Sequence, residues 1–155
     1  MNTLNAAIVG GGAIHLCHAL ALQQVPGAHL QALAEIDSDK GQALAQTYGC
    51  RFYRDYHALL GSDDIDVVHI CTPHHLHKTM VMEALAAGKH VFCEKPIGLD
   101  GREAAEIAAA AARAPGRLAG CYQNRLNPTS RQIISELAGG TLGKMVGMSA
   151  VLTWS

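Results

Sequence analysis

The sequence predicts a doubly wound α/β fold, in which helices cover both faces of a parallel β-sheet. Short apolar segments alternate along most of the chain with segments of helical length, which is typical of βαβ units. A run of three glycines, Gly10 to Gly12, stands between the first apolar segment and the first helical one. Hydrophobic residues make up 49% of the 155 residues and charged residues 16%, so the chain can form a hydrophobic core.

The expected strands are short apolar runs that end in glycine, proline or polar residues. They cover residues 4–9, 29–35, 66–71, 90–94 and 118–122. Helices are expected over residues 12–24, 38–47, 73–87 and 102–113. Two helix starts have an explicit chemical cause. Thr72 can cap the helix that has Pro73 at its first position, and Asp100 followed by Glu103 is close to a capping box.

The end of the sequence predicts the start of a second α/β domain. A helix opens at Asn127-Pro128, and residues 145–154 alternate between apolar and small or polar side chains, as in a strand with one buried face. A lone helix and strand cannot bury that face. We therefore expect residues 1–123 to form a dinucleotide-binding domain and residues 124–155 to be the first helix and strand of a truncated C-terminal substrate domain. The alternative is a small protein whose last strand pairs with a partner chain, and an unpaired apolar strand of this kind also predicts a homo-oligomer.

Charge and cysteine content argue against several classes of protein. Twelve basic and thirteen acidic residues give a net charge of −1, and aromatic residues make up only 5%, so no nucleic-acid partner is expected. The five cysteines are odd in number and form no C-x-x-C motif, which predicts reduced thiols and a cytoplasmic chain. The sequence begins without a basic segment and long apolar run, and its longest alanine run, residues 108–112, is far shorter than the roughly 20 residues that span a bilayer, so no membrane partner is expected.

The glycine run has the position of a dinucleotide-binding loop, directly after a strand and at the start of a helix. Gly10 allows the tight turn, and Gly12 lets the backbone approach a pyrophosphate at the helix N-terminus. Ala13 and Ile14 follow in the same loop and are also expected to bind the cofactor, whereas His15 replaces the third glycine of G-x-G-x-x-G. The alternative is a strand-to-helix turn with a purely structural role.

An acidic residue, Glu35, ends the second expected strand. A carboxylate there accepts hydrogen bonds from the adenosine ribose hydroxyls and repels a 2′-phosphate, so it predicts NAD rather than NADP as the cofactor. The alternative is a helix-capping cluster, since Asp37, Ser38 and Asp39 stand at the next helix start, and we expect Asp37 mainly to cap.

Three histidines, His74, His75 and His77, follow Thr72-Pro73 at the carboxyl end of a predicted parallel strand. Ligands of open α/β sheets bind at that edge, so Thr72 and the backbone are expected to contact the cofactor. A metal site is not expected here, because no cysteine or carboxylate completes a local ligand set and neighbouring histidines on a helix point in different directions.

The dipeptide Glu94-Lys95 ends the next strand and is followed by Pro96. Proline restricts the preceding residue to extended geometry, which fixes the direction of the Lys95 side chain. Lys95 is therefore expected at the same sheet edge as Thr72. The alternative is an ordinary exposed lysine before a turn.

These segments resemble the Gfo/Idh/MocA oxidoreductase family, which includes glucose-fructose oxidoreductase and inositol dehydrogenases. The resemblance covers essentially the whole chain. It is carried by Gly10-x-Gly12, residues 72–77 (Thr-Pro-His-His-Leu-His), residues 86–96 (Ala-Ala-Gly-Lys-His-Val-Phe-Cys-Glu-Lys-Pro) and residues 122–125 (Tyr-Gln-Asn-Arg). It implies an N-terminal Rossmann domain followed by an α/β domain with a large, mostly antiparallel sheet.

The resemblance also implies roles for individual residues. Lys95 would lie beside the nicotinamide and the substrate as the catalytic residue of this chain, with Glu94 orienting it or the cofactor. The other cofactor-binding positions that it implies are Thr72, Pro73 and His77 along the cleft and Asn124, which lies beside Arg125 at the entry to the second domain. Two features depart from the family pattern: His15 stands in the glycine loop, and the family's catalytic Asp and His lie in the second domain, beyond the last residue here.

The predicted function of the parent protein is that of an NAD-dependent oxidoreductase. A hydride would pass between the nicotinamide and a carbon bearing a hydroxyl or carbonyl on a sugar, cyclitol or similar polyol, while Lys95 hydrogen-bonds that oxygen and helps to move its proton. This chain alone is expected to be inactive. The alternative is a non-catalytic NAD-binding or sensing module that associates through its C-terminal strand. A methyltransferase is a weaker alternative, because that class does not require Glu-Lys-Pro after the fourth strand.

Overall fold

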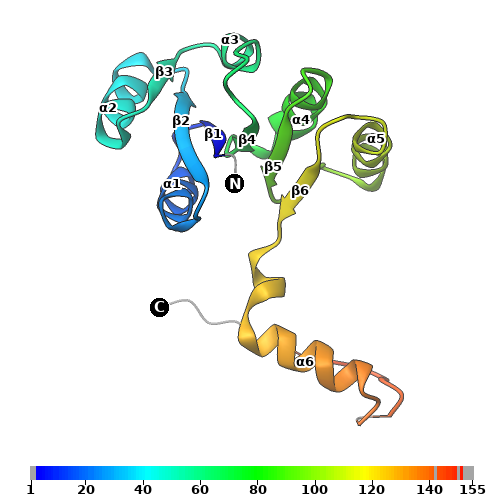
Figure 1. Cartoon of the computed structure of the whole chain (residues 1–155). Coiled ribbons are helices and arrows are strands. Elements are labelled where there is room, and N and C mark those ends of the chain that lie inside the picture. The colour runs from blue at the N-terminus through cyan, green and yellow to red at the C-terminus, as the bar shows by residue number, and fades with distance from the viewer. Residues whose placement is uncertain (1–2, 142, 150, 152–155) are drawn as a thin grey trace. The chain divides into compact units, whose positions relative to one another are not determined.

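The chain forms two compact units, Met1–Cys121 and Tyr122–Ser155 (Figure 1). The computed structural model describes residues 3–141, 143–149 and 151. Each unit is considered by itself below.

The first unit contains a six-stranded, fully parallel sheet, so the predicted fold class is confirmed. Across the sheet the strands are ordered β3 (Arg51–Tyr53), β2 (Ala28–Ala34), β1 (Leu4–Val9), β4 (Val67–Ile70), β5 (His90–Glu94) and β6 (Leu118–Cys121). The chain runs outward from β1 to β3, then returns to the other side of β1 and continues outward to β6. This reversal makes the gap between the carboxyl ends of β1 and β4 the place where a doubly wound sheet binds its ligand.

Helices cover both faces of the sheet and bury two apolar clusters. They are α1 (His15–Gln24), α2 (Ser38–Tyr48), α3 (Tyr56–Leu60), the 3₁₀ turn η1 (His74–Leu76), α4 (His77–Ala86) and α5 (Gly101–Ala111). Figure 1 shows α1 beside β2 in the blue half of the unit and α4 and α5 next to β5 and β6 in the green and yellow half. The larger cluster includes Val68 and Ile70 of β4, Val81 of α4 and Ile107 of α5, and the smaller one packs Ala19 and Leu22 of α1 against β1.

The helix starts show which predicted caps form. Asp37 is the N-cap of α2 and accepts from the Lys40 backbone N–H, as expected. Asp100 caps α5 by accepting from the Glu103 N–H, while the Glu103 carboxylate accepts from the backbone N–H of Leu99. The predicted cap at Thr72 is wrong.

Thr72 donates its hydroxyl to the Met80 sulfur at 3.3 Å instead of capping the helix. Pro73 is the N-cap of η1, with φ −58° and ψ 143°. The helix expected over residues 73–87 therefore begins as one 3₁₀ turn and becomes α-helical only at His77. The proline ring fixes φ near −65° but leaves ψ free. Pro73 has an extended ψ, so it is the last residue before the helical turn and not the first residue of the helix.

Two short elements, β3 and α3, were not expected from the sequence. β3 has three residues and pairs only with β2, and α3 has five residues. Elements this short show no clear hydrophobic period, so their formation depends on the sheet edge and the core that they cover. Leu59 of α3 is fully buried in the larger apolar cluster.

The second unit contains the 3₁₀ turn η2 (Gln123–Leu126) and helix α6 (Pro128–Ala138), whose proline stands at the helix start as predicted. The strand expected over residues 145–154 is not formed at residues 145–149 and 151, and its other positions lie outside the described residues. A strand needs a neighbour for its backbone hydrogen bonds, and the described sheet consists only of strands from the first unit. Among the described residues no helix is both long and apolar enough to cross a bilayer.

A close backbone approach at Gly116 gives a stability prediction. A Cβ on Gly116 would lie 2.0 Å from the carbonyl oxygen of Lys89, whereas a Cβ on Gly101 meets nothing within 4 Å. We expect Gly116→Ala to lower the free energy of unfolding by roughly 1–3 kcal/mol, the usual cost of overpacking. Gly101→Ala, at the first position of α5, is the matched control and should leave stability unchanged or raise it by up to about 1 kcal/mol. Urea denaturation measures the stability of both variants, and equal stability would contradict the close approach of residue 116 to the Lys89 carbonyl.

Candidate functional site

The turn after β1 packs directly against the end of β4. Gly10 has a φ of 98°, and a Cβ at this position would lie 2.8 Å from the carbonyl oxygen of Cys71. A non-glycine residue is disfavoured there both by its φ and by the clash. At Gly12 the nearest atom to an added Cβ is that same oxygen at 4.0 Å, so the loop is more open at this residue.

His15 takes the position of the third glycine without opening the loop. One ring nitrogen faces the carbonyl oxygen of Gly12, and the other lies 3.0 Å from the hydroxyl of Tyr48 at the end of α2. The residue is 9% exposed, so its side chain folds over the start of α1 rather than into solvent. The side chain therefore braces the turn between β1 and α1.

Glu35 follows β2 and reaches back to the glycine loop. Its carboxylate accepts hydrogen bonds from the backbone N–H groups of Gly11 at 2.8 Å and Asp37 at 3.2 Å, and from the Lys40 ammonium at 3.2 Å. Burial alone would raise the pKa of Glu35, but these hydrogen bonds outweigh it and lower the pKa below its ordinary value. Glu35 is therefore an ionised acid at the loop.

These segments surround a cavity of about 460 Å³ at the carboxyl ends of β1, β2 and β4. Of the residues predicted to bind the cofactor, Gly10, Gly12, Glu35, Thr72 and Pro73 line this cavity. Lys40 and Arg54, which the sequence did not single out, add two cationic side chains to its wall. Ala13 and Ile14 do not line it, and Ile14 packs against the smaller apolar cluster.

His77 is fully buried and does not line the cavity, contrary to the expectation that it lies along the cleft. Its Nδ1 lies 2.7 Å from the carbonyl oxygen of Pro96 and its Nε2 lies 2.9 Å from that of Thr72. Both partners are acceptors, and a neutral imidazole carries a single N–H, so the ring donates to one of the two carbonyls while it lies against the other. The ring thus stands between the loops after β4 and β5. His74 and His75 are exposed.

Glu94 and Lys95 end β5 with opposite exposures. Glu94 is 5% exposed, whereas Lys95 is exposed and lies outside the cavity wall. The backbone N–H of Lys95 donates to the Glu94 carboxylate at 3.1 Å. Ile70 of β4 pairs with Cys93 of β5 in the sheet. Thr72 and Lys95 each follow two residues after this pair, so both lie at the carboxyl edge of the sheet.

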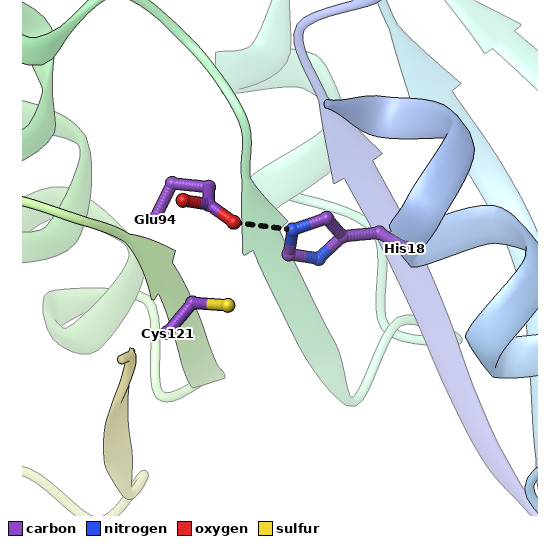
Figure 2. Close-up of side chains that lie close together, drawn as sticks. All are labelled: His18, Glu94 and Cys121. Atoms are coloured by element: carbon purple, nitrogen blue, oxygen red, sulfur yellow. Dashed lines mark hydrogen bonds and ion pairs between the residues drawn. The ribbon is translucent and has the colours of Figure 1, made fainter. Parts of the chain in front are cut away.

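Asn124 belongs to the second unit, where its side-chain oxygen lies 3.5 Å from the Asn127 amide nitrogen. A cluster of three residues in the first unit was not predicted from the sequence. Figure 2 shows His18 of α1, Glu94 of β5 and Cys121 of β6 converging, with His18 bonded to Glu94 at 3.0 Å. No local motif signals this cluster, because its members come from three elements far apart in the sequence.

Comparison with known proteins identifies the family. The model described as "Oxidoreductase family, NAD-binding Rossmann fold", that of Gfo/Idh/MocA proteins, matches residues 4–120, which is more than half of the chain. The chain belongs to the Gfo/Idh/MocA oxidoreductase family. The predicted resemblance is thereby confirmed. The glycine loop, Thr72 and Lys95 all lie within the matched region.

Dehydrogenases are among the similar members of this family. Inositol 2-dehydrogenase of Rhizobium meliloti (strain 1021) is 30% identical over 143 residues, which cover 92% of this chain and 43% of that protein. The solved structure of a levoglucosan dehydrogenase with NADH and levoglucosan has a TM-score of 0.85 at 26% identity, covering 92% of this chain and 41% of that one. A 3-ketoreductase from Actinomadura kijaniata, solved with NADP, has a TM-score of 0.83 at 29% identity, covering 90% and 43%. The chain thus spans less than half the length of the relatives that it matches.

The buried position of His77 gives a second stability prediction. His77→Leu removes the buried ring between the two loops and leaves a half-buried carbonyl without its donor, so it should lower the free energy of unfolding by about 1–3 kcal/mol. The control is His75→Leu, the same change two residues earlier at an exposed position, with an effect within about 0.5 kcal/mol. Thermal melts of the two variants check this, and similar melting temperatures would show that the His77 hydrogen bonds contribute little.

Proposed function

We propose that this chain is the cofactor-binding part of an NAD-dependent oxidoreductase of the Gfo/Idh/MocA family. The complete enzyme transfers a hydride between the nicotinamide and a hydroxyl- or carbonyl-bearing carbon of a sugar, cyclitol or similar polyol. The observation that carries the proposal is the cavity between the carboxyl ends of β1 and β4, with the glycine loop and the ionised Glu35 in its wall. The inositol and levoglucosan dehydrogenases among its relatives support the polyol class.

The pyrophosphate is assigned to the N-terminus of α1. The amides of Gly12, Ala13 and Ile14 precede the first turn of this ten-residue helix, where backbone N–H groups lack intrahelical acceptors and the helix dipole favours an anion. The Gly11 N–H is already bonded to Glu35, so it orients the acid instead of the phosphate.

The choice of NAD depends on Glu35. Its carboxylate would accept hydrogen bonds from the ribose hydroxyls and repel a 2′-phosphate. Lys40 and Arg54 oppose this preference, because cations in the same wall attract phosphate, but Lys40 is paired with Glu35 itself. Relatives have been solved with NADH and with NADP. The balance between the charge of Glu35 and those of Lys40 and Arg54 therefore decides which of the two cofactors this chain prefers.

The remaining roles follow from position at the same sheet edge. Thr72 and Pro73 form the cavity wall, and His77 holds their loop to Pro96 instead of contacting the cofactor. Glu94 fixes the backbone of Lys95, whose exposed ammonium would hydrogen-bond the substrate oxygen and assist its proton transfer. Asn124, in the second unit, would contact the cofactor in the assembled enzyme.

Cofactor preference is tested by thermal shift with NAD and NADP. We expect both to stabilise the chain through selective binding to the folded state, by about 2.7 kcal/mol at a hundredfold excess over Kd, with NAD reaching this effect at lower concentration. Glu35→Ala should narrow the difference in Kd between NAD and NADP, since it removes both the ribose acceptor and the repulsion of the 2′-phosphate. Asp39→Ala removes an exposed acid from the first turn of α2 and should leave the difference unchanged. A lower Kd for NADP in the wild-type chain would overturn the assignment of Glu35.

The role of Lys95 is tested in a protein that carries a complete substrate domain after this chain. Lys95→Ala should lower turnover by roughly 10²–10⁴, the usual contribution of a positioned acid–base group, while the Kd for NAD stays the same. Lys78→Ala, on α4, serves as the control and should retain wild-type turnover. Steady-state kinetics separate the two outcomes, and full activity of the Lys95 variant would make this lysine a bystander. A complete protein that binds NAD but turns over no polyol would favour the alternative, a cofactor-binding module.

A further inference from the structure

Three side chains with metal-binding atoms meet outside the cavity wall, and they come from α1, β5 and β6. The ligand atoms of His18, Glu94 and Cys121 all lie within 4.8 Å of one another. His18 and Glu94 are each 5% exposed, and Cys121 is half-buried. Figure 2 shows all three side chains directed toward a common point between α1 and the ends of β5 and β6.

The hydrogen bonds show where protons lie in the cluster. His18, Cys121 and the Lys95 backbone N–H all form hydrogen bonds with the Glu94 side chain, whose carboxylate oxygens accept them. The Nε2 of His18, 3.0 Å from Glu94 Oε1, must then carry a proton and donate it. The thiol of Cys121 likewise donates to Glu94. Two protons therefore occupy positions that a single cation can take.

A fourth residue orients the imidazole. The Nδ1 of His18 lies 2.9 Å from the Nδ1 of His69 on β4, so one of these nitrogens donates and the other accepts. For His18 to bind a metal ion, its ring proton moves from Nε2 to Nδ1, which then donates to His69, and Nε2 presents a lone pair to the cluster. A partner behind the ring that fixes this tautomer is the usual support of a metal-bound histidine.

We propose that His18, Glu94 and Cys121 form a binding site for a zinc ion. One nitrogen, one oxygen and one sulfur ligand match zinc, whereas magnesium and calcium favour oxygen ligands alone. Bond lengths of about 2.0 Å to nitrogen and oxygen and about 2.3 Å to sulfur need ligand atoms roughly 3–4 Å apart, so a small rotation of the half-buried Cys121 side chain completes the set. Three protein ligands leave the fourth tetrahedral position to water.

Charge balance favours a divalent ion at this place. Without metal, the Glu94 carboxylate is a buried anion that accepts hydrogen bonds from His18 and Cys121. Zinc binding forms bonds to His18 Nε2, Cys121 Sγ and a Glu94 oxygen. The thiol proton of Cys121 goes to solvent, whereas the imidazole keeps one proton, which moves from Nε2 to the Nδ1 that faces His69. The charges of Zn²⁺, the thiolate and the carboxylate then sum to zero. Burial of a neutral cluster costs less than burial of a lone anion.

Cobalt binding tests the site on this chain, without a cofactor or a substrate. The chain is prepared without a polyhistidine tag, treated with a chelator and titrated with Co²⁺, which stands in for zinc and reports thiolate ligation by a charge-transfer band in the near ultraviolet. We expect the band to saturate at one equivalent and to disappear on addition of Zn²⁺. Binding by exposed imidazoles such as His74 and His75 gives no thiolate band, so this readout excludes adventitious binding there.

Cysteine and histidine variants assign the ligands. Cys121→Ala should abolish the band, whereas Cys17→Ala, which removes an exposed thiol next to His18 in sequence, should retain it. His69→Leu should keep the band but weaken Co²⁺ affinity by roughly 10- to 100-fold, the usual effect of removing a residue that supports a metal ligand. Equal melting temperatures of Cys121→Ala and the wild-type chain in chelator establish that the variant folds.

Three outcomes would overturn the proposal: no charge-transfer band, a band that survives Cys121→Ala, or a band lost in Cys17→Ala. The cavity is lined by none of the three ligands, so the result is independent of NAD binding.

Discussion

The approach of the Gly10 turn to the Cys71 carbonyl is the constraint on which the rest of the first unit depends. Only a residue without a Cβ fits there, because the turn has a positive φ and its α-carbon faces a backbone oxygen. This contact brings the end of β1 against the end of β4 at the point where the strand order reverses. The glycine loop, the Glu35 side chain and the Thr72 loop all border the cavity that results.

Buried polar side chains hold the loops around this edge in register. His15 joins the glycine loop to Tyr48, His77 joins the loops after β4 and β5, and Glu94 joins the end of β5 to α1 through His18. No buried side-chain nitrogen or oxygen among the described residues lacks a hydrogen-bond partner. Loops connected in this way keep their positions without a bound ligand, which reduces the ordering cost of binding.

Histidine performs unrelated tasks at different places in this unit. His77 and His15 are structural, and His18 with His69 supports the metal site that we propose, whereas His74 and His75 are exposed. The same side chain serves these tasks because each ring nitrogen can donate or accept, depending on the atom that faces it. Residue type alone is therefore a poor guide to function in a histidine-rich segment such as residues 74–77.

The sequence by itself determined the fold class, the glycine turn and the family, because these depend on hydrophobic periodicity and on short motifs of neighbouring residues. It also predicted the cap at Asp37 and the helix start at Pro128. Only the tertiary structure decided that Thr72 bonds Met80 instead of capping, that His77 is buried away from the cavity, and that β3 and α3 form at all. It alone brought Lys40 and Arg54 to the wall beside Glu35, and His18 and Cys121 to Glu94. Those outcomes depend on contacts between strands and helices distant along the chain, and the order of the strands, which no local pattern contains, sets which residues meet.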